Sequence, residues 1–283
     1  VYRSTNGGRS WNPTNVGISG LSVQALAVSS EFRSDQMVFA GIVNGGICRS
    51  VDGGRTWEQM GSEELETATV QAIALSPDFD GSPTIVVGTE EQGLWISHDA
   101  GKTWSKVDVV GDGSVNAVAI SPMFSDDETI VACSSADGVV VSTDGGMSWE
   151  IRSTDDSFGS ILTLALLPMA DGVALWAGTY KTGLLRSEDF GSSWQARNDG
   201  LTSQNWISIG LSPDFATDQT MFAGGAGSGM RVSNDGGSAW QACGDELNDL
   251  DISNVAISPS FSSDGHVLAA TQAGLFRSVD RGR

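Results

Sequence analysis

The sequence has little positive charge for its size and no long apolar run. Its 283 residues include 15 Lys and Arg against 35 Asp and Glu, a formal net charge of −20. This balance argues against a nucleic-acid binder, because such proteins neutralise phosphates with Lys and Arg. No stretch of about 18 apolar residues is present, so the sequence predicts no membrane-spanning helix. A hydrophobic fraction of 40% with 18% charged residues excludes a disordered chain.

Cysteine and histidine are also scarce. Cys48, Cys133 and Cys243 lie far apart and have neither the density of a disulfide framework nor the spacing of metal ligands. We interpret them as small buried hydrophobic residues, which leaves the redox compartment open. His98 and His266 are the two histidines, and neither belongs to a metal-ligand cluster or to a Ser/His/Asp arrangement.

The dominant feature of the sequence is a repeated motif, Ser-x-Asp-x-Gly-x-x-Trp, which we call the box. Its third position recurs at intervals of 45 to 47 residues. The residues at this position are Asn6, Asp52, Asp99, Asp144, Asp189, Asp235 and Asp280. The motif ends in Trp11, Trp57, Trp104, Trp149, Trp194 and Trp240, and the seventh copy stops before its Trp.

Each box lies inside a longer unit that reads as four short strands. An alternating run ending in Ser-Pro-x-Phe, such as residues 70–79, is followed by a β-branched stretch such as 84–89. A third run enters the box, as at 93–97, and the Trp opens a fourth. Four strands in about 45 residues are typical of a β-propeller blade. No stretch has sustained helical periodicity, so we expect little helix.

Counting strands along the chain gives the expected number of blades. The chain begins in a third strand, contains five full four-strand units and ends after a third strand, which makes 25 strands. We therefore predict an all-β, six-bladed β-propeller with four-stranded antiparallel blades, whose terminal strands share one blade. Seven blades are the alternative. We expect residues 1–283 to form a single domain, and both ends cut through a repeat, as in a fragment or trimmed piece of a longer chain.

The box residues are predicted to be structural. An Asp side chain can accept hydrogen bonds from N–H groups of its own turn, and Gly supplies a positive φ. The closing Trp is expected to bury its ring between blades. A catalytic group is not needed once per repeat, and Asn6 occupies the Asp position with an amide, which can cap a turn but cannot act as a base.

These motifs resemble the Asp-box, or bacterial neuraminidase repeat (BNR), superfamily of β-propellers, and the resemblance covers essentially the whole chain. The regular repeats are most similar to uncharacterised bacterial members. The superfamily also includes sialidases, xyloglucan-cleaving glycosidases, sortilin-type receptors and photosystem II assembly factors. The resemblance implies the propeller fold and favours an extracellular or cell-envelope location. It does not imply a particular function.

The sequence has few of the features that the enzymes of this superfamily need for catalysis. A sialidase needs three converging arginines and a Tyr nucleophile, whereas only Arg152, Arg197 and Tyr180 are expected on the face opposite the boxes. The xyloglucan-cleaving enzymes place paired carboxylates in a cleft between two propellers, and this chain is expected to form only one propeller. Tyr180 and Trp206 are the only large aromatics expected at that face, because Trp95 and Trp176 lie in mid-strand and are expected in the core.

We therefore predict a non-enzymatic binding or scaffold module that uses an acidic face. The strand 2–3 loops and the linkers between blades should share this face, opposite the boxes. Its ligand candidates are Glu63, Glu64, Glu66, Glu90, Glu91, Tyr180 and Trp206. Further acids expected there are Asp108, Asp112, Asp137, Asp155, Asp156, Asp199, Asp245, Glu246, Asp249 and Asp251, against Arg152, Lys181 and Arg197.

Such a face would attract a basic protein partner or weakly bound Ca²⁺, and no other metal or cofactor is expected. The prediction is a monomer that neither binds nucleic acid nor inserts into a membrane. Two alternatives stay open. The acids could serve only as a solubilising coat, and the chain could be a carbohydrate-active enzyme or glycan-binding module of the Asp-box type.

Overall fold

The regular structure of the described residues consists mainly of short antiparallel β-sheets. The structure is a computed structural model and describes residues 1–20, 22–153, 159–169 and 172–283. Its residues group into two compact units, Val1–Thr154 and Asp155–Arg283, called unit 1 and unit 2 below. The single domain expected over the whole chain stays a prediction.

Unit 1 contains a two-stranded sheet followed by three four-stranded sheets. Its strands are β1 (Tyr2–Arg3), β2 (Asn12–Pro13), β3 (Val23–Val28), β4 (Val38–Ile42), β5 (Gly46–Ser50), β6 (Glu58–Met60), β7 (Val70–Leu75), β8 (Ile85–Thr89), β9 (Leu94–Ser97), β10 (Ser105–Lys106), β11 (Val115–Ile120), β12 (Ile130–Ser134), β13 (Gly138–Ser142) and β14 (Glu150–Ser153). Its helices are α1 (Phe32–Asp35), α2 (Phe124–Asp127) and the 3₁₀ helix η1 (Leu65–Thr67).

Unit 2 contains two four-stranded sheets and one three-stranded sheet. Its strands are β15 (Ile161–Met169), β16 (Gly172–Thr179), β17 (Leu184–Ser187), β18 (Gln195–Ala196), β19 (Trp206–Leu211), β20 (Met221–Gly225), β21 (Gly229–Ser233), β22 (Gln241–Ala242), β23 (Ile252–Ile257), β24 (Val267–Thr271) and β25 (Gly274–Ser278). Its helices are α3 (Phe215–Asp218), α4 (Phe261–Asp264) and the 3₁₀ helix η3 (Asp245–Leu247).

The fold is the predicted all-β, six-bladed β-propeller, and the described residues form strands β1 to β25, the number that the sequence indicated. Five blades are complete four-stranded sheets with consecutive strands paired. The sheets β1–β2 and β23–β25 come from the two ends of the chain and lie in different units. The sharing of one blade between these end strands stays a prediction.

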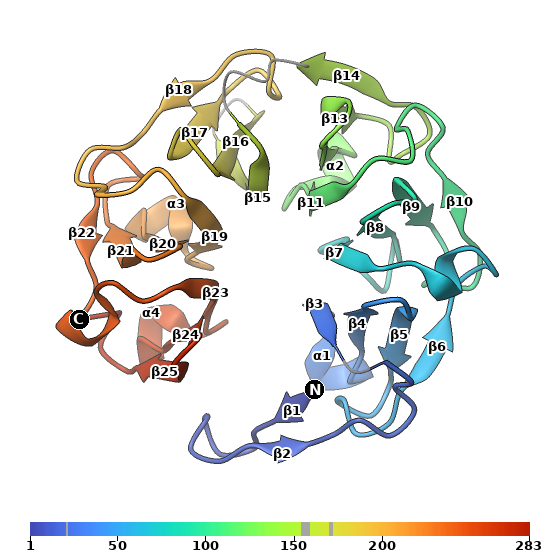
Figure 1. The fold of residues 1–283 in the computed structure, drawn as a ribbon, viewed down its shortest axis with the longest axis horizontal. Helices are drawn as coiled ribbons and strands as arrows, with labels where there is room; N and C mark the ends of the chain where they lie inside the picture. Colours follow the sequence, from blue (N-terminus) through green and yellow to red (C-terminus); the bar gives the residue numbers. More distant parts are fainter. Residues whose placement is uncertain (21, 154–158, 170–171) are drawn as a thin grey trace. The chain divides into compact units, whose positions relative to one another are not determined.

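Neighbouring blades within a unit pack through their first strands. In unit 1, β3 packs on β7 and β7 on β11, and in unit 2, β15 packs on β19 and β19 on β23 (Figure 1). The pairing register shifts near the start of every first strand, as between Val70 and Ala72. The second strands β8 and β20 are buried along their whole length, because each lies between two neighbouring blades of its own unit.

The Ser-Pro-x-Phe segments lead into short helical turns that the sequence did not predict. In four blades the Phe, or its counterpart Phe32, begins one α-helical turn (α1, α2, α3 and α4) that ends in a left-handed residue. The Ser hydroxyl bonds the Asp that closes the turn, as Ser121 does with Asp127 (2.6 Å). Phe79 packs edge-on against Phe39 of the preceding blade at 5.7 Å. A single turn is too short to produce the helical periodicity on which prediction depends.

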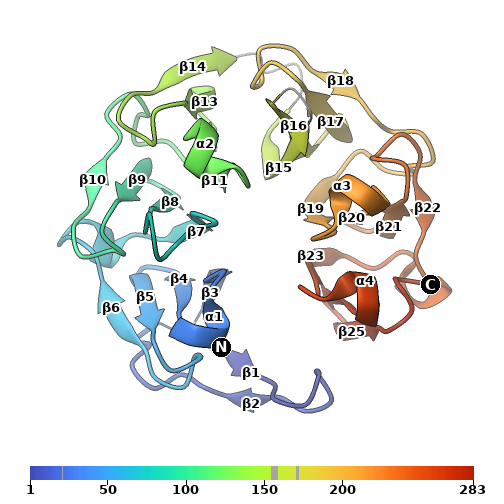
Figure 2. The ribbon, with the colours of Figure 1, turned by 180° about the vertical axis from the view of Figure 1, so that it is seen from behind.

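Within each unit, hydrogen bonds show which loops lie together on each of the two sides of the blades. Boxes bond to strand 1–2 connections, as when the Gly53 N–H donates to the Gln36 carbonyl (2.9 Å). Strand 2–3 loops bond to blade linkers, as when the Glu90 N–H donates to the Thr69 carbonyl (2.9 Å). We call these two sides the box face and the loop face; Figures 1 and 2 view the strands from opposite directions.

Candidate functional site

The box aspartates accept hydrogen bonds from residues of their own turns, as Asp52 shows. Ser50 Oγ donates to Asp52 Oδ1 (2.8 Å) and accepts from the Gly54 N–H (2.8 Å). The Thr56 N–H donates to Asp52 Oδ1 (2.9 Å), and the Thr56 hydroxyl donates to Oδ2 (2.7 Å). Both carboxylate oxygens therefore already accept hydrogen bonds within the turn.

Hydrogen bonds of this kind lower the pKa of several box aspartates. The Thr56 backbone N–H is the main cause of a pKa for Asp52 far below its usual range. The backbone N–H of Thr103 likewise lowers the pKa of Asp99 to about 2, and the Ser148 hydroxyl lowers that of Asp144 to about 2. A carboxylate with so low a pKa is a poor general base at neutral pH, which agrees with the predicted structural role.

The box tryptophans form two groups. The rings of Trp57 and Trp240 are buried, at 6% and 3% exposure, and their indole N–H groups donate to carbonyls 43 residues earlier. Trp104 is half-buried and bonds to Gly101 of its own box, and Trp11 is 39% exposed. Trp149 and Trp194 are also half-buried. Uniform burial of these rings was expected, and it holds fully for only two of them.

The loop face of unit 1 presents a group of exposed glutamates on well-anchored backbone. Leu65 in η1 is fully buried and holds the linker against the core, while Glu63, Glu64 and Glu66 are exposed. The Gly46 N–H donates to the Ala68 carbonyl (2.9 Å), which fixes this linker to the strand 2–3 loop of its own blade. The side chains are therefore carried by a backbone with little freedom to move.

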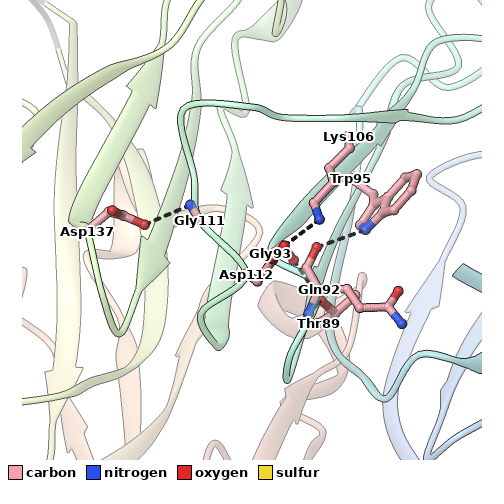
Figure 3. Close-up of polar contacts among 8 residues, drawn as sticks. All are labelled: Thr89, Gln92, Gly93, Trp95, Lys106, Gly111, Asp112 and Asp137. Atoms are coloured by element: carbon pink, nitrogen blue, oxygen red, sulfur yellow. Dashed lines mark hydrogen bonds and ion pairs between the residues drawn. The ribbon is translucent and has the colours of Figure 1, made fainter. Parts of the chain in front are cut away.

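Glu90 and Glu91 are exposed on the next strand 2–3 loop. Thr89 closes this loop by donating its hydroxyl to the Gly93 carbonyl (2.8 Å), and the Trp95 indole donates to the Gln92 carbonyl (3.1 Å). Figure 3 shows these contacts beside the following linker. The loop that carries the two glutamates is thus closed by its own hydrogen bonds.

The structure adds one cation to the loop face that the sequence analysis did not place there. Lys106 ends β10 and its Nζ contacts Asp112 Oδ1 at 2.5 Å (Figure 3). Asp137 is half-buried and accepts from the Gly111 N–H (3.1 Å) and the Ser134 hydroxyl (3.0 Å). Asp112 and Asp137 are therefore partly satisfied locally, unlike the glutamates.

The remaining predicted acids can be placed individually. Asp155 and Asp156 lie outside the described residues. The acids exposed to solvent are Asp108, Asp199, Asp245, Glu246, Asp249 and Asp251. Leu247 in η3 is buried, with Asp245 and Glu246 exposed beside it. This arrangement repeats in unit 2 the pattern of the linker around Leu65.

The two aromatic candidates differ in access. Tyr180 is 53% exposed, with the Lys181 Nζ 6.0 Å from its ring centroid. Trp206 is fully buried, and its indole N–H donates to the Ser203 carbonyl (3.0 Å). The expectation that Trp206 offers a surface platform is therefore wrong, because its ring is needed in the core of its unit. Trp95 and Trp176 are buried, as expected.

The arginines expected on the loop face have local partners, and a third arginine reaches a blade linker. Arg152 pairs with Glu150 (2.8 Å), and Arg197 donates to the Gln195 side chain (3.1 Å). Arg231 lies in β21, the strand that enters a box, and its Nη2 donates to the Thr202 hydroxyl oxygen (3.0 Å) in a blade linker. The sequence already distinguishes Arg231, because the equivalent position in the other repeats carries an uncharged residue.

No preformed metal centre is seen in the described residues, where no three His, Cys, Asp or Glu side chains group around a common point. Cys48, Cys133 and Cys243 are buried and unpaired, as expected for small core residues. Burial raises the pKa of the Cys133 thiol far above its usual range. Among described residues, no helix is long and apolar enough to cross a membrane.

Comparison with known proteins agrees with the fold. Residues 92–224, just under half of the chain, match the Sortilin-Vps10 family model, described as sortilin, neurotensin receptor 3. No curated protein matches the chain.

Solved structures with similar folds are distant in sequence. The extracellular domain of a putative one-component system from B. thetaiotaomicron is 16% identical at a TM-score of 0.67, covering 93% of this chain and 32% of that one. The GH74 enzyme of Niastella koreensis is 18% identical at a TM-score of 0.74, and the match covers 95% of this chain and 45% of that enzyme. YCF48, solved bound to a D1 peptide, is 16% identical at a TM-score of 0.67, and the match covers 95% of this chain and 81% of YCF48.

The chain thus spans about a third to a half of the length of the first two proteins. At these identities the likenesses show the propeller fold alone.

Proposed function

We propose that this chain is a non-enzymatic binding module that takes a basic protein segment on the loop face of unit 1. One observation carries the proposal. Glu63, Glu64, Glu66, Glu90 and Glu91 are all exposed, lie on two hydrogen-bonded segments, and form no ion pair with any described residue. A row of unpaired charges of one sign attracts a partner of the opposite sign from a distance.

The anchoring of these segments supports binding rather than general solvation. The Gln59 side chain donates to the carbonyls of Gly45 (3.3 Å) and Glu66 (3.0 Å), which connects the linker to the neighbouring loop. Side chains on a fixed backbone lose less freedom when they bind, so more of their electrostatic attraction is retained as affinity. Among the proteins of similar fold, YCF48 has been solved bound to a D1 peptide, which is a precedent for peptide binding by a propeller.

The proposal is tested with a fluorescent peptide of alternating Lys and Ser residues. We expect its affinity, measured by anisotropy, to fall several-fold between about 20 mM and about 150 mM NaCl, because salt screens exposed charges. The variant Glu63→Lys/Glu64→Lys/Glu66→Lys should weaken binding at least tenfold at the lower salt concentration.

The control makes the same change of charge on the box face of unit 1, where Glu31, Asp126 and Glu128 are exposed on strand 1–2 connections. Replacing these three residues by Lys should reduce affinity much less, since they lie away from the loop face. Equal losses in the two triple variants would show that only net charge matters and would support the alternative of a solubilising coat.

A glycan-binding function is the second candidate, and Tyr180 is the observation that favours it. Its ring is 53% exposed, as a sugar-stacking platform must be, and a GH74 enzyme shares the fold. Titration with xyloglucan oligosaccharides decides this point. Binding that is lost in Tyr180→Ala would support a glycan ligand, and no binding to the parent chain would remove it.

A further inference from the structure

Arg231 occupies a position that is uncharged in every other repeat. It lies two residues before the box Ser233 in β21 and pairs with Ala223 of β20. The residues at the same position in the other repeats are Tyr2, Cys48, Trp95, Val140, Leu185 and Phe276. Cys48, Trp95, Val140 and Leu185 are core residues with at most 4% exposure.

The side chain of Arg231 is buried but lacks a counter-ion. Its exposure is 9%, and none of the described carboxylates lies within ion-pair distance. Nη2 donates to Thr202 Oγ1 (3.0 Å), and Nε is buried without an acceptor. Burial raises the pKa of the Cys243 thiol to about 12, and the positive charge of Arg231 opposes this rise only in part. The thiol is therefore neutral and cannot balance the guanidinium.

This arrangement is costly for the folded chain alone. An arginine keeps its positive charge in proteins, and burying a charge without a partner destabilises the folded state. The chain has 35 acidic residues available, yet the only acceptor bonded to this guanidinium among the residues described is a hydroxyl. A ligand anion would supply the missing partner.

The guanidinium of Arg231 contacts a residue that is exposed to solvent. Thr202 is exposed in the linker between β18 and β19, on the loop face of unit 2, so the guanidinium end lies next to the surface. The Thr202 oxygen accepts from Nη2, which leaves its own O–H free to donate. An anion at this point could accept from both the guanidinium and the hydroxyl.

We propose that Arg231 and Thr202 form a binding site for a singly charged carboxylate group on the loop face of unit 2. The planar guanidinium matches the two oxygens of a carboxylate. Exposed Asp199 lies in the same linker as Thr202, and the chain carries a net charge of −20, so a doubly charged phosphate is repelled more strongly than a carboxylate. This site does not depend on the acidic surface of unit 1.

The test measures thermal unfolding of the chain in sodium acetate, sodium phosphate and sodium chloride at equal ionic strength and neutral pH. Acetate should raise the Tm of the parent by about 1–3 °C above the chloride value, since a ligand that binds only the folded state stabilises it. Arg231→Leu, which introduces the residue found at position 185, should abolish this shift and leave the Tm in chloride unchanged or higher.

Further variants separate binding from packing. Arg231→Lys keeps the charge but loses the planar fork, and it should lose most of the acetate shift; it also decides the question if Arg231→Leu does not fold. Thr202→Val should weaken acetate binding several-fold, with Thr202→Ser restoring it. Arg186→Leu removes an arginine already paired with Glu188 (2.7 Å) and should retain the full shift.

Three results would overturn the proposal. One is the absence of an acetate effect on the parent chain, and another is an acetate effect that persists in Arg231→Leu. The third is a larger shift in phosphate than in acetate, which would assign the site to another class of anion.

Discussion

The indole Nε1 of Trp57 donates a 2.9 Å hydrogen bond to the carbonyl oxygen of Thr14, 43 residues earlier in the chain. The Trp57 backbone N–H also donates to the Val16 carbonyl (2.8 Å). At Gly17, where φ is +96°, a Cβ atom would stand 1.9 Å from the Trp57 carbonyl oxygen. The box Trp thus holds the linker that precedes its blade, and the linker needs glycine at the point of closest approach.

The same contact occurs in unit 2. Trp240 donates from its indole to the Arg197 carbonyl (3.0 Å) and from its backbone to the Asp199 carbonyl (2.9 Å). Gly200, at a φ of +82°, lies against the Trp240 carbonyl oxygen. Both linkers contain Asn-x-Gly followed by Ile or Leu, at residues 15–18 and 198–201. In these two linkers the pattern coincides with a buried box Trp.

Replacing buried and half-buried box tryptophans should have unequal effects. We expect Trp57→Ala to lower the free energy of unfolding by about 3–5 kcal/mol, because it opens a cavity and frees the linker. Trp104 is half-buried and bonds within its own box, so Trp104→Ala should cost about 1–2 kcal/mol. Urea denaturation of the two variants measures this difference. Equal losses would contradict the division of the tryptophans into two groups.

The two glycines of a box should also differ, and box 142–149 provides a matched pair. Gly145 has a φ of +71°, and an added Cβ would meet nothing nearer than Phe124 at 4.0 Å. Ala100 occupies the same position in another box at a φ of +60°. At Gly146, φ is +94° and the Cβ would lie 2.2 Å from Cδ1 of Ile96, which is buried.

We therefore expect Gly145→Ala to cost about 1 kcal/mol, the strain of the left-handed conformation alone. Gly146→Ala should cost about 2–4 kcal/mol, because overpacking of the core is added to that strain. The measurement is again urea denaturation of each variant. A larger loss for Gly145→Ala than for Gly146→Ala would show that the contact with Ile96 is easily relieved.

Most of the fold could be predicted because the box is a local signal. Its Ser, Asp and Gly residues bond to one another within a few positions, as Ser50 and Asp52 do, so the turn is encoded where it forms. Repetition of that turn then set the strand number. The one-turn helices α1 to α4 were not predicted because a single turn is too short to produce helical periodicity. Packing of a Phe against the preceding blade, as in the contact of Phe261 with Phe222 at 5.9 Å, is likewise visible only in three dimensions.

The candidate site was predicted less completely, since exposure depends on tertiary packing. Trp206 and Tyr180 both stand at the ends of strands in the sequence, yet one ring is fully buried and the other 53% exposed. Lys106 escaped notice because its pairing with Asp112 spans a strand end and a linker. Arg231 could have been found by aligning the repeats, and its lack of a counter-ion could be seen only in three dimensions.

Removing one box carboxylate should affect stability and leave binding intact. Asp52→Ala loses the acceptor for the Thr56 N–H, the Thr56 hydroxyl and Ser50. We expect a fall in Tm of a few degrees, with unchanged affinity for the Lys/Ser peptide at a temperature where the variant is folded. Loss of peptide binding at an unchanged Tm would show that the box takes part in recognition.

Acid should destabilise the chain through its box aspartates. The pKa values of Asp99 and Asp144 are about 2 in the folded chain, lowered chiefly by the Thr103 N–H and the Ser148 hydroxyl, against about 3.9 when unfolded. Because the folded pKa is the lower one, their contribution is complete above about pH 4 and is lost as the pH falls towards 2.

The double variant Asp99→Asn/Asp144→Asn should therefore show a smaller loss of stability than the parent between about pH 4 and pH 2. Asn6 shows that an amide can occupy this position: its Oδ1 accepts from the Ser10 N–H (3.0 Å), and its Nδ2 donates to the Ser10 hydroxyl (2.8 Å). Urea midpoints measured at several pH values provide the test. Parallel pH profiles for parent and variant would show that acid acts through other groups, because the variant has no carboxylate to protonate at these two positions.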